Sequence, residues 1–124
     1  MNKKRPKHLA LHLIKLPLPG IVSILHRASG LALFFALPLL LLMLQYSLRS
    51  IETYTQLSIL LAHPLLKLML LGLLWAFLHH FCAGLRYLAI DLHYVSNLAQ
   101  ARNSSKLVMV ASLAMTVLAG VKLW

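Results

Sequence analysis

The chain has 124 residues, of which 60% are hydrophobic, and its mean hydropathy is +0.82. This apolar share exceeds the roughly 45–50% of a soluble domain, so the composition excludes an ordinary soluble fold and predicts an integral membrane protein. Twelve Lys and Arg stand against two acidic residues, Glu52 and Asp91, giving a formal charge of +10. Because the basic residues lie at the ends of apolar runs, they indicate membrane topology, and we expect no nucleic-acid partner.

Residues 1–20 form a basic, partly amphipathic segment that ends in a turn containing Pro and Gly. We expect this short segment to lie at the membrane interface. It lacks the apolar core and small-residue cleavage site of a signal peptide, so we expect the first membrane span to be retained. His8 and His12 have the i, i+4 spacing of a helical ligand pair. No third ligand is nearby, so two headgroup-facing histidines are the simpler alternative.

A polar cluster at positions 21–30 precedes a long uncharged run. Ser23 and Arg27 in this cluster are spaced i, i+4 and therefore share one face of a helix. No charge appears between residues 28 and 48, and at 1.5 Å per residue this run can cross a hydrocarbon core about 30 Å thick. It is the first predicted transmembrane helix, with an expected kink at Pro38.

The polar segment 49–61 is expected to be a loop that leads to a second span at about 65–86. His63 and Pro64 suit the start of that second helix, because proline is preorganised for a first turn. A polar connection and a third span at about 107–124 complete an all-α fold with three transmembrane helices.

This pattern divides the chain into an interfacial segment, 1–20, and a three-helix transmembrane domain, 21–124. Nine of the twelve Lys and Arg fall on the side of the amino terminus and the second connection. The positive-inside bias therefore predicts a cytoplasmic amino terminus and, with three spans, a periplasmic carboxyl terminus. The Lys-rich start differs from an Arg- and Ser-rich transit peptide, which favours the inner membrane of a bacterial cell.

Two adjacent histidines, His79 and His80, lie inside the second predicted span. A polar group in hydrocarbon is costly unless it is satisfied, so imidazole there indicates a partner, a cavity or a metal. His80 could be an axial haem ligand, with Gly84 one turn later allowing a flat ring to approach; a hydrogen bond to a neighbouring helix is an equal alternative. His79 points about 100° away, toward the edge of the site or the lipid. One deep histidine would leave a six-coordinate haem in need of a ligand from a partner chain.

Ser23 and Arg27 offer a hydroxyl and a fixed cation, which suit a quinone carbonyl and its reduced anion. A helix start and a topology anchor are the plainer alternative. A small transporter is a further alternative, but it normally needs an acidic residue within a span, and neither Glu52 nor Asp91 lies in one. Three helices without a visible soluble domain favour a subunit of a complex over an independent enzyme.

Two motifs resemble the cytochrome b large membrane-anchor subunit of succinate dehydrogenase. They are Ser-Ile-Leu-His-Arg-Ala-Ser-Gly at 23–30 and His-x-x-x-Gly-Leu-Arg-x-x-x-x-Asp at 80–91, and the resemblance covers nearly the whole chain. It implies a bacterial subunit that works with a second small membrane-anchor subunit, an iron–sulfur subunit and a flavoprotein subunit. Electrons would pass from the iron–sulfur subunit to ubiquinone, while succinate oxidation would occur in another subunit.

By the same resemblance, His80 is the axial ligand of haem b, and the second anchor supplies the other ligand. Ser23 and Arg27 line the ubiquinone site, and His26 lies near the haem propionates and the quinone. Tyr87 stands where bacterial relatives often have histidine. A fumarate reductase anchor that uses menaquinone and a structural anchor that binds no haem are the alternatives within this architecture.

Overall fold

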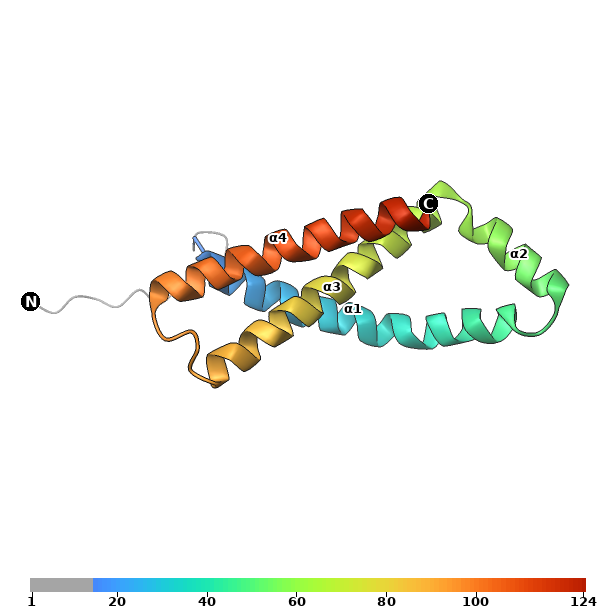
Figure 1. Cartoon of the computed structure of the whole chain (residues 1–124). Helices are drawn as coiled ribbons and strands as arrows, with labels where there is room; N and C mark the ends of the chain where they lie inside the picture. The colour runs from blue at the N-terminus through green and yellow to red at the C-terminus, as the bar shows by residue number, and fades with distance from the viewer. Residues whose placement is uncertain (1–14) are drawn as a thin grey trace, which may run out of the picture.

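A computed structural model of the chain describes residues 15–124 (Figure 1). Four helices follow one another along the chain: α1 (Leu18–Ser47), α2 (Ile51–Leu61), α3 (Pro64–Asp91) and α4 (Leu98–Leu123). The described residues contain no strand, which confirms the all-α prediction. Most of the expected interfacial segment, including His8 and His12, lies outside the described residues.

Three of the helices, α1, α3 and α4, are long and apolar enough to cross a membrane, which confirms the three predicted spans. Each helix extends beyond the apolar run that predicted it. The first helix begins at Leu18, directly after Pro17 and with a proline in its first turn, where the missing N–H costs no hydrogen bond. The polar cluster at 21–30 is therefore part of α1 and lies on a continuous helix.

The segment after α1 differs from the expectation, because residues 51–61 form a helix and not a loop. Its start is a capping box: the Thr53 N–H donates to the Ser50 hydroxyl at 3.2 Å, and the Ser50 N–H donates to Thr53 Oγ1 at 3.0 Å. The predicted start of the next helix is confirmed. His63 precedes α3 and accepts a hydrogen bond from the Leu65 N–H, with Pro64 in the first turn.

The third helix packs against both α1 and α4, and its contacts with α4 reach to the carboxyl end of that helix (Figure 1). The buried apolar core here is small and consists of Val22, Ala83 and Val108. Small residues at such contacts let membrane helices approach closely. Most of the large apolar side chains point outward, as expected for a surface that faces lipid or partner helices.

The helices α1 and α3 diverge toward their opposite ends, where α2 connects them (Figure 1). We call this the α2 end, comprising residues 36–73, and we call the opposite end, comprising 18–30 and 79–91, the histidine end. At the α2 end the Lys67 ammonium lies 5.9 Å from the centroid of the Trp124 ring. Lys and Trp side chains in this arrangement are typical of a membrane–water interface.

Candidate functional site

The side chain of His80 is held by the backbone of α1. Its Nδ1 lies 2.9 Å from the carbonyl oxygen of His26 and 3.2 Å from the hydroxyl oxygen of Ser29. Because a carbonyl oxygen can only accept, Nδ1 carries the proton and donates it. The other ring nitrogen, Nε2, forms no hydrogen bond within residues 15–124 and is the one left to offer a lone pair.

The ring of His26 stacks on the ring of His80, with centroids 4.1 Å apart and planes inclined by 10°. Stacking covers a face of the His80 ring but not its Nε2 lone pair, which lies in the ring plane. The Ser29 hydroxyl donates to the same His26 carbonyl at 2.9 Å, so two donors converge on one oxygen. His26 thus positions His80 with both its backbone and its side chain.

Gly30 allows this close approach of α1 and α3. A Cβ atom at this position would lie 2.8 Å from His80 Cε1 and 3.3 Å from its Nδ1, closer than a methyl group can come without displacing the ring. Gly84 faces His26 instead, and a Cβ there would meet His26 Nε2 at an ordinary 3.9 Å. The sequence motif contains Ser29 and Gly30, but the motif alone does not reveal their contact with His80. Their i+3 and i+4 spacing from His26 was the signal that places all three on one face.

The predicted quinone residues lie on α1 beside the histidine cluster. Ser23 is partly buried and Arg27 is exposed. Neither the Ser23 hydroxyl nor the Arg27 guanidinium forms a hydrogen bond within residues 15–124, so both groups can bind a polar ligand or a partner subunit. They lie at the same end of the molecule as Arg86, because the His26 ring of α1 meets the ring of Tyr87, the residue after Arg86 on α3.

Arg86 is buried and connects α3 to α4. Its Nε donates to the Ser104 hydroxyl at 3.0 Å and its Nη2 donates to the Ala101 carbonyl oxygen at 3.3 Å. The guanidinium carbon also lies 5.5 Å from the centroid of the Tyr87 ring. Tyr87 in turn lies 5.1 Å from His26, ring centroid to ring centroid, and its buried hydroxyl has no hydrogen-bond partner within residues 15–124.

His79 is fully buried, so of its two expected positions the one facing lipid is wrong. It shares a helix face with Ala83, which packs against Val22 and Val108 in the core. Its ring lies 5.3 Å from that of Trp75, and neither ring nitrogen has a hydrogen-bond partner within the described part of the chain. That part of the chain also contains no group of three His, Cys, Asp or Glu that could hold a bare metal ion.

Three apolar spans around a polar histidine cluster define an integral, multi-pass membrane protein. Residues 1–119 match the family model described as the succinate dehydrogenase/fumarate reductase transmembrane subunit. The chain is 40% identical to the succinate dehydrogenase cytochrome b556 subunit of Coxiella burnetii (strain RSA 493 / Nine Mile phase I) over 100% of both chains. The chain therefore belongs to the succinate dehydrogenase cytochrome b556 family of membrane subunits.

Two further relatives carry the same name. The protein of Rickettsia felis (strain ATCC VR-1525 / URRWXCal2) is 31% identical over 93% of this chain and 90% of its own length. The protein of Paracoccus denitrificans is 32% identical over 92% of this chain and 88% of its own length. Residues 1–119, which match the family model, contain both motifs of this chain.

Proposed function

We propose that this chain is a membrane anchor of a succinate dehydrogenase. Together with a second small anchor subunit, it would bind haem b and ubiquinone. It would help electrons pass from the iron–sulfur subunit to quinone. The observation that carries the proposal is the geometry of His80. A histidine that binds a metal usually donates its other ring N–H to a carbonyl, a carboxylate or water. His80 does so through Nδ1, which leaves Nε2 as the ligand atom.

The residues of the histidine end fit a haem. His80 would hold the iron through Nε2, and the partner anchor subunit would supply the other ligand. The Tyr87 hydroxyl, buried and without a partner in the described chain, offers a donor to a haem propionate. His26 keeps the His80 ring in place through the stacking and the carbonyl contact. When bound, haem b would supply one-electron storage at its iron.

Ser23 and Arg27 would bind ubiquinone at the edge of the same cluster. The Ser23 hydroxyl can donate to a quinone carbonyl oxygen. The Arg27 guanidinium provides a fixed positive charge that stabilises negative charge on that oxygen as the quinone is reduced. Protons would reach the site from the cytoplasmic side, because the distribution of Lys and Arg puts this end of α1 toward the cytoplasm. The relatives described above are all named as succinate dehydrogenase subunits, which favours this direction over a fumarate reductase with menaquinone.

The histidine end would face the cytoplasm of a bacterial cell and dock the iron–sulfur and flavoprotein subunits. The distribution of Lys and Arg supports this orientation. The carboxyl terminus, in contrast, would be periplasmic, and a reporter fused there tests the proposal. Alkaline phosphatase fused to the carboxyl terminus should be active, as expected for a periplasmic position. Fluorescence of a fluorescent protein that folds only in the cytoplasm, fused at the same position, would contradict the orientation.

Substitution of His80 tests the haem ligand. We expect the purified complex to show a b-type band in a reduced-minus-oxidised spectrum, and His80→Ala to lose that band or shift it strongly. His93→Asn is the matched control, because His93 is exposed in the loop after α3 and asparagine tolerates its positive φ of 63°. A wild-type spectrum for His80→Ala would refute the assignment.

Substitution of Ser23 and Arg27 tests the quinone site. Ser23→Ala and Arg27→Ala should each lower ubiquinone reduction by about 10- to 100-fold, as expected for a lost charge-assisted contact of about 1.5–3 kcal/mol. Electron transfer from succinate to a soluble dye should be unchanged, because that reaction does not use this chain. Arg102→Gln is the control for loss of one positive charge, because Arg102 is exposed on α4. Normal quinone turnover in both variants would exclude these two residues from the site.

A further inference from the structure

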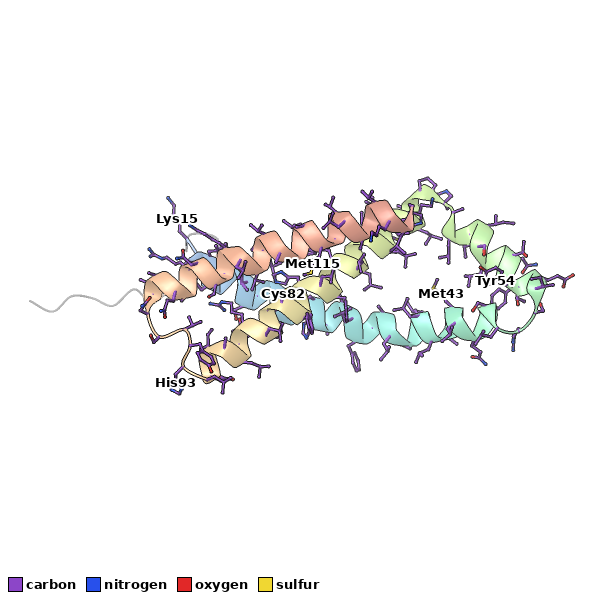
Figure 2. The ribbon with its side chains drawn as sticks, viewed as in Figure 1. Lys15, Met43, Tyr54, Cys82, His93 and Met115 are labelled. Carbon is purple, nitrogen blue, oxygen red and sulfur yellow. The ribbon has the colours of Figure 1, made fainter. Side chains whose placement is uncertain are left out.

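The α2 end contains an apolar groove of about 340 Å³ between the diverging helices. Leucines from three helices line it, among them Leu40 of α1, Leu60 of α2 and Leu70 of α3. Figure 2 shows the Met43 side chain pointing from α1 into this space. The lining is apolar and therefore suits a hydrocarbon chain. Two of the three helices that form it, α1 and α3, are candidate membrane spans.

A second groove of about 370 Å³ adjoins the first and has a polar mouth. The two grooves share Met43 and Leu57, so they form one continuous surface. The mouth presents Gln45, Tyr46 and Arg49 at the end of α1. Arg49 is exposed and forms no ion pair within residues 15–124.

A hydrogen bond across the corner between α1 and α2 fixes the shape of this mouth. The Tyr46 hydroxyl donates to Gln56 Oε1 at 2.6 Å, which holds the two helices together beside Arg49. Arg49 follows directly after the uncharged run 28–48, so it lies where the membrane-spanning part of α1 ends. A positive charge therefore lies at the end of this span, directly beside a groove suited to hydrocarbon.

We propose that the two adjoining grooves bind one anionic phospholipid, with its phosphate at Arg49 and one acyl chain along the apolar groove. Charge complementarity selects the headgroup, because basic residues near the membrane surface attract anionic lipids. The apolar lining selects an amphiphile over a soluble anion. Each groove also falls within the roughly 300–1,000 Å³ typical of ligand sites. The proposal is independent of haem and quinone binding at the other end.

Native mass spectrometry of the purified complex tests the headgroup. Detergent-solubilised complex is titrated with phosphatidylglycerol and, separately, with phosphatidylcholine carrying the same acyl chains. The wild type should retain phosphatidylglycerol preferentially, and Arg49→Gln should lower this preference by about 3- to 5-fold. Arg49→Lys should keep it. Lys122→Gln, which removes a charge at the same end of α4 but outside the grooves, should also leave it unchanged.

A second pair of variants tests the acyl-chain groove. Ala36→Phe fills the groove and should lower the retention of both lipids, whereas Ala114→Phe adds the same bulk on the exposed face of α4 and should not. Equal retention of the two lipids by the wild type, or an unchanged preference in Arg49→Gln, would overturn the proposal. So would efficient cross-linking of Met43→Cys to the second anchor subunit, because a protein segment would then occupy the groove.

Discussion

The two ends of the molecule use the same pair of helices in opposite ways. At the histidine end α1 and α3 come so close that a methyl group at Gly30 would collide with the His80 ring. At the α2 end the same helices separate, and leucines line the groove between them. Within residues 15–124 the side-chain hydrogen bonds between α1 and α3 occur only at the histidine end.

This difference shows what holds membrane helices together. Lipid chains are as apolar as leucine, so burying leucine between helices gains little over leaving it in the bilayer. Close packing of small residues and hydrogen bonds between helices provide the association instead. Ser29, Gly30 and the two stacked histidines supply both at one end. Between α1 and α3 the α2 end lacks them, and the groove there is lined by apolar side chains.

Of the variants that test this difference between the two ends, Gly30→Ala should have the largest effect, because it disturbs the close approach of α1 and α3 at the histidine end. Alanine is a better helix former than glycine by about 0.5–1 kcal/mol, so a loss can only come from the new methyl group against His80. We expect the His80 ring to shift and most of the haem to be lost, measured as the haem-to-flavin ratio of the purified complex. Gly72→Ala is the control, because no atom lies within 4 Å of the added Cβ. Wild-type haem content in Gly30→Ala would show that the approach of α1 and α3 is not critical.

A smaller effect should follow from Ser104→Ala, which leaves the buried Nε of Arg86 without its hydrogen-bond partner. Such an unpaired buried donor costs about 1–3 kcal/mol. We expect a lower thermal unfolding temperature for the purified complex. Ser58→Ala, an exposed position on α2, removes a hydroxyl without such a contact and should leave that temperature unchanged. Equal stability of the two variants would show that Arg86 does not hold α4 to α3.

The sequence alone predicted the parts of this structure that depend on the bilayer. Hydrocarbon thickness sets the length of an apolar run, so the three spans were predicted, and Pro64 placed the start of α3. The helix α2 was missed because its capping box has Thr53 where Glu or Gln is the usual signal, and its polar residues also suit a loop.

The histidine contacts could not be predicted in the same way. A spacing of one residue shows that His79 and His80 point in different directions, but not which of them faces the core. That choice depends on where α1 crosses α3, and hence on Gly30 and on the packing of Val22. The family resemblance selected His80 as a ligand, whereas only the structure shows that the His26 carbonyl orients it.

The smallest and most local effect should come from Ser50→Ala, which removes the hydroxyl that caps α2. Loss of such a cap costs about 1 kcal/mol, and α2 buries none of its residues against the rest of the described chain, so little else holds its first turn. Hydrogen–deuterium exchange should therefore be faster at the first amides of α2, but not in Thr55→Ala, whose hydroxyl bonds only within the helix. The haem spectrum should be the same in both variants, because the histidine end is held by contacts that do not involve α2. A spectral change in Ser50→Ala would mean that the two ends are coupled through α1 and α3.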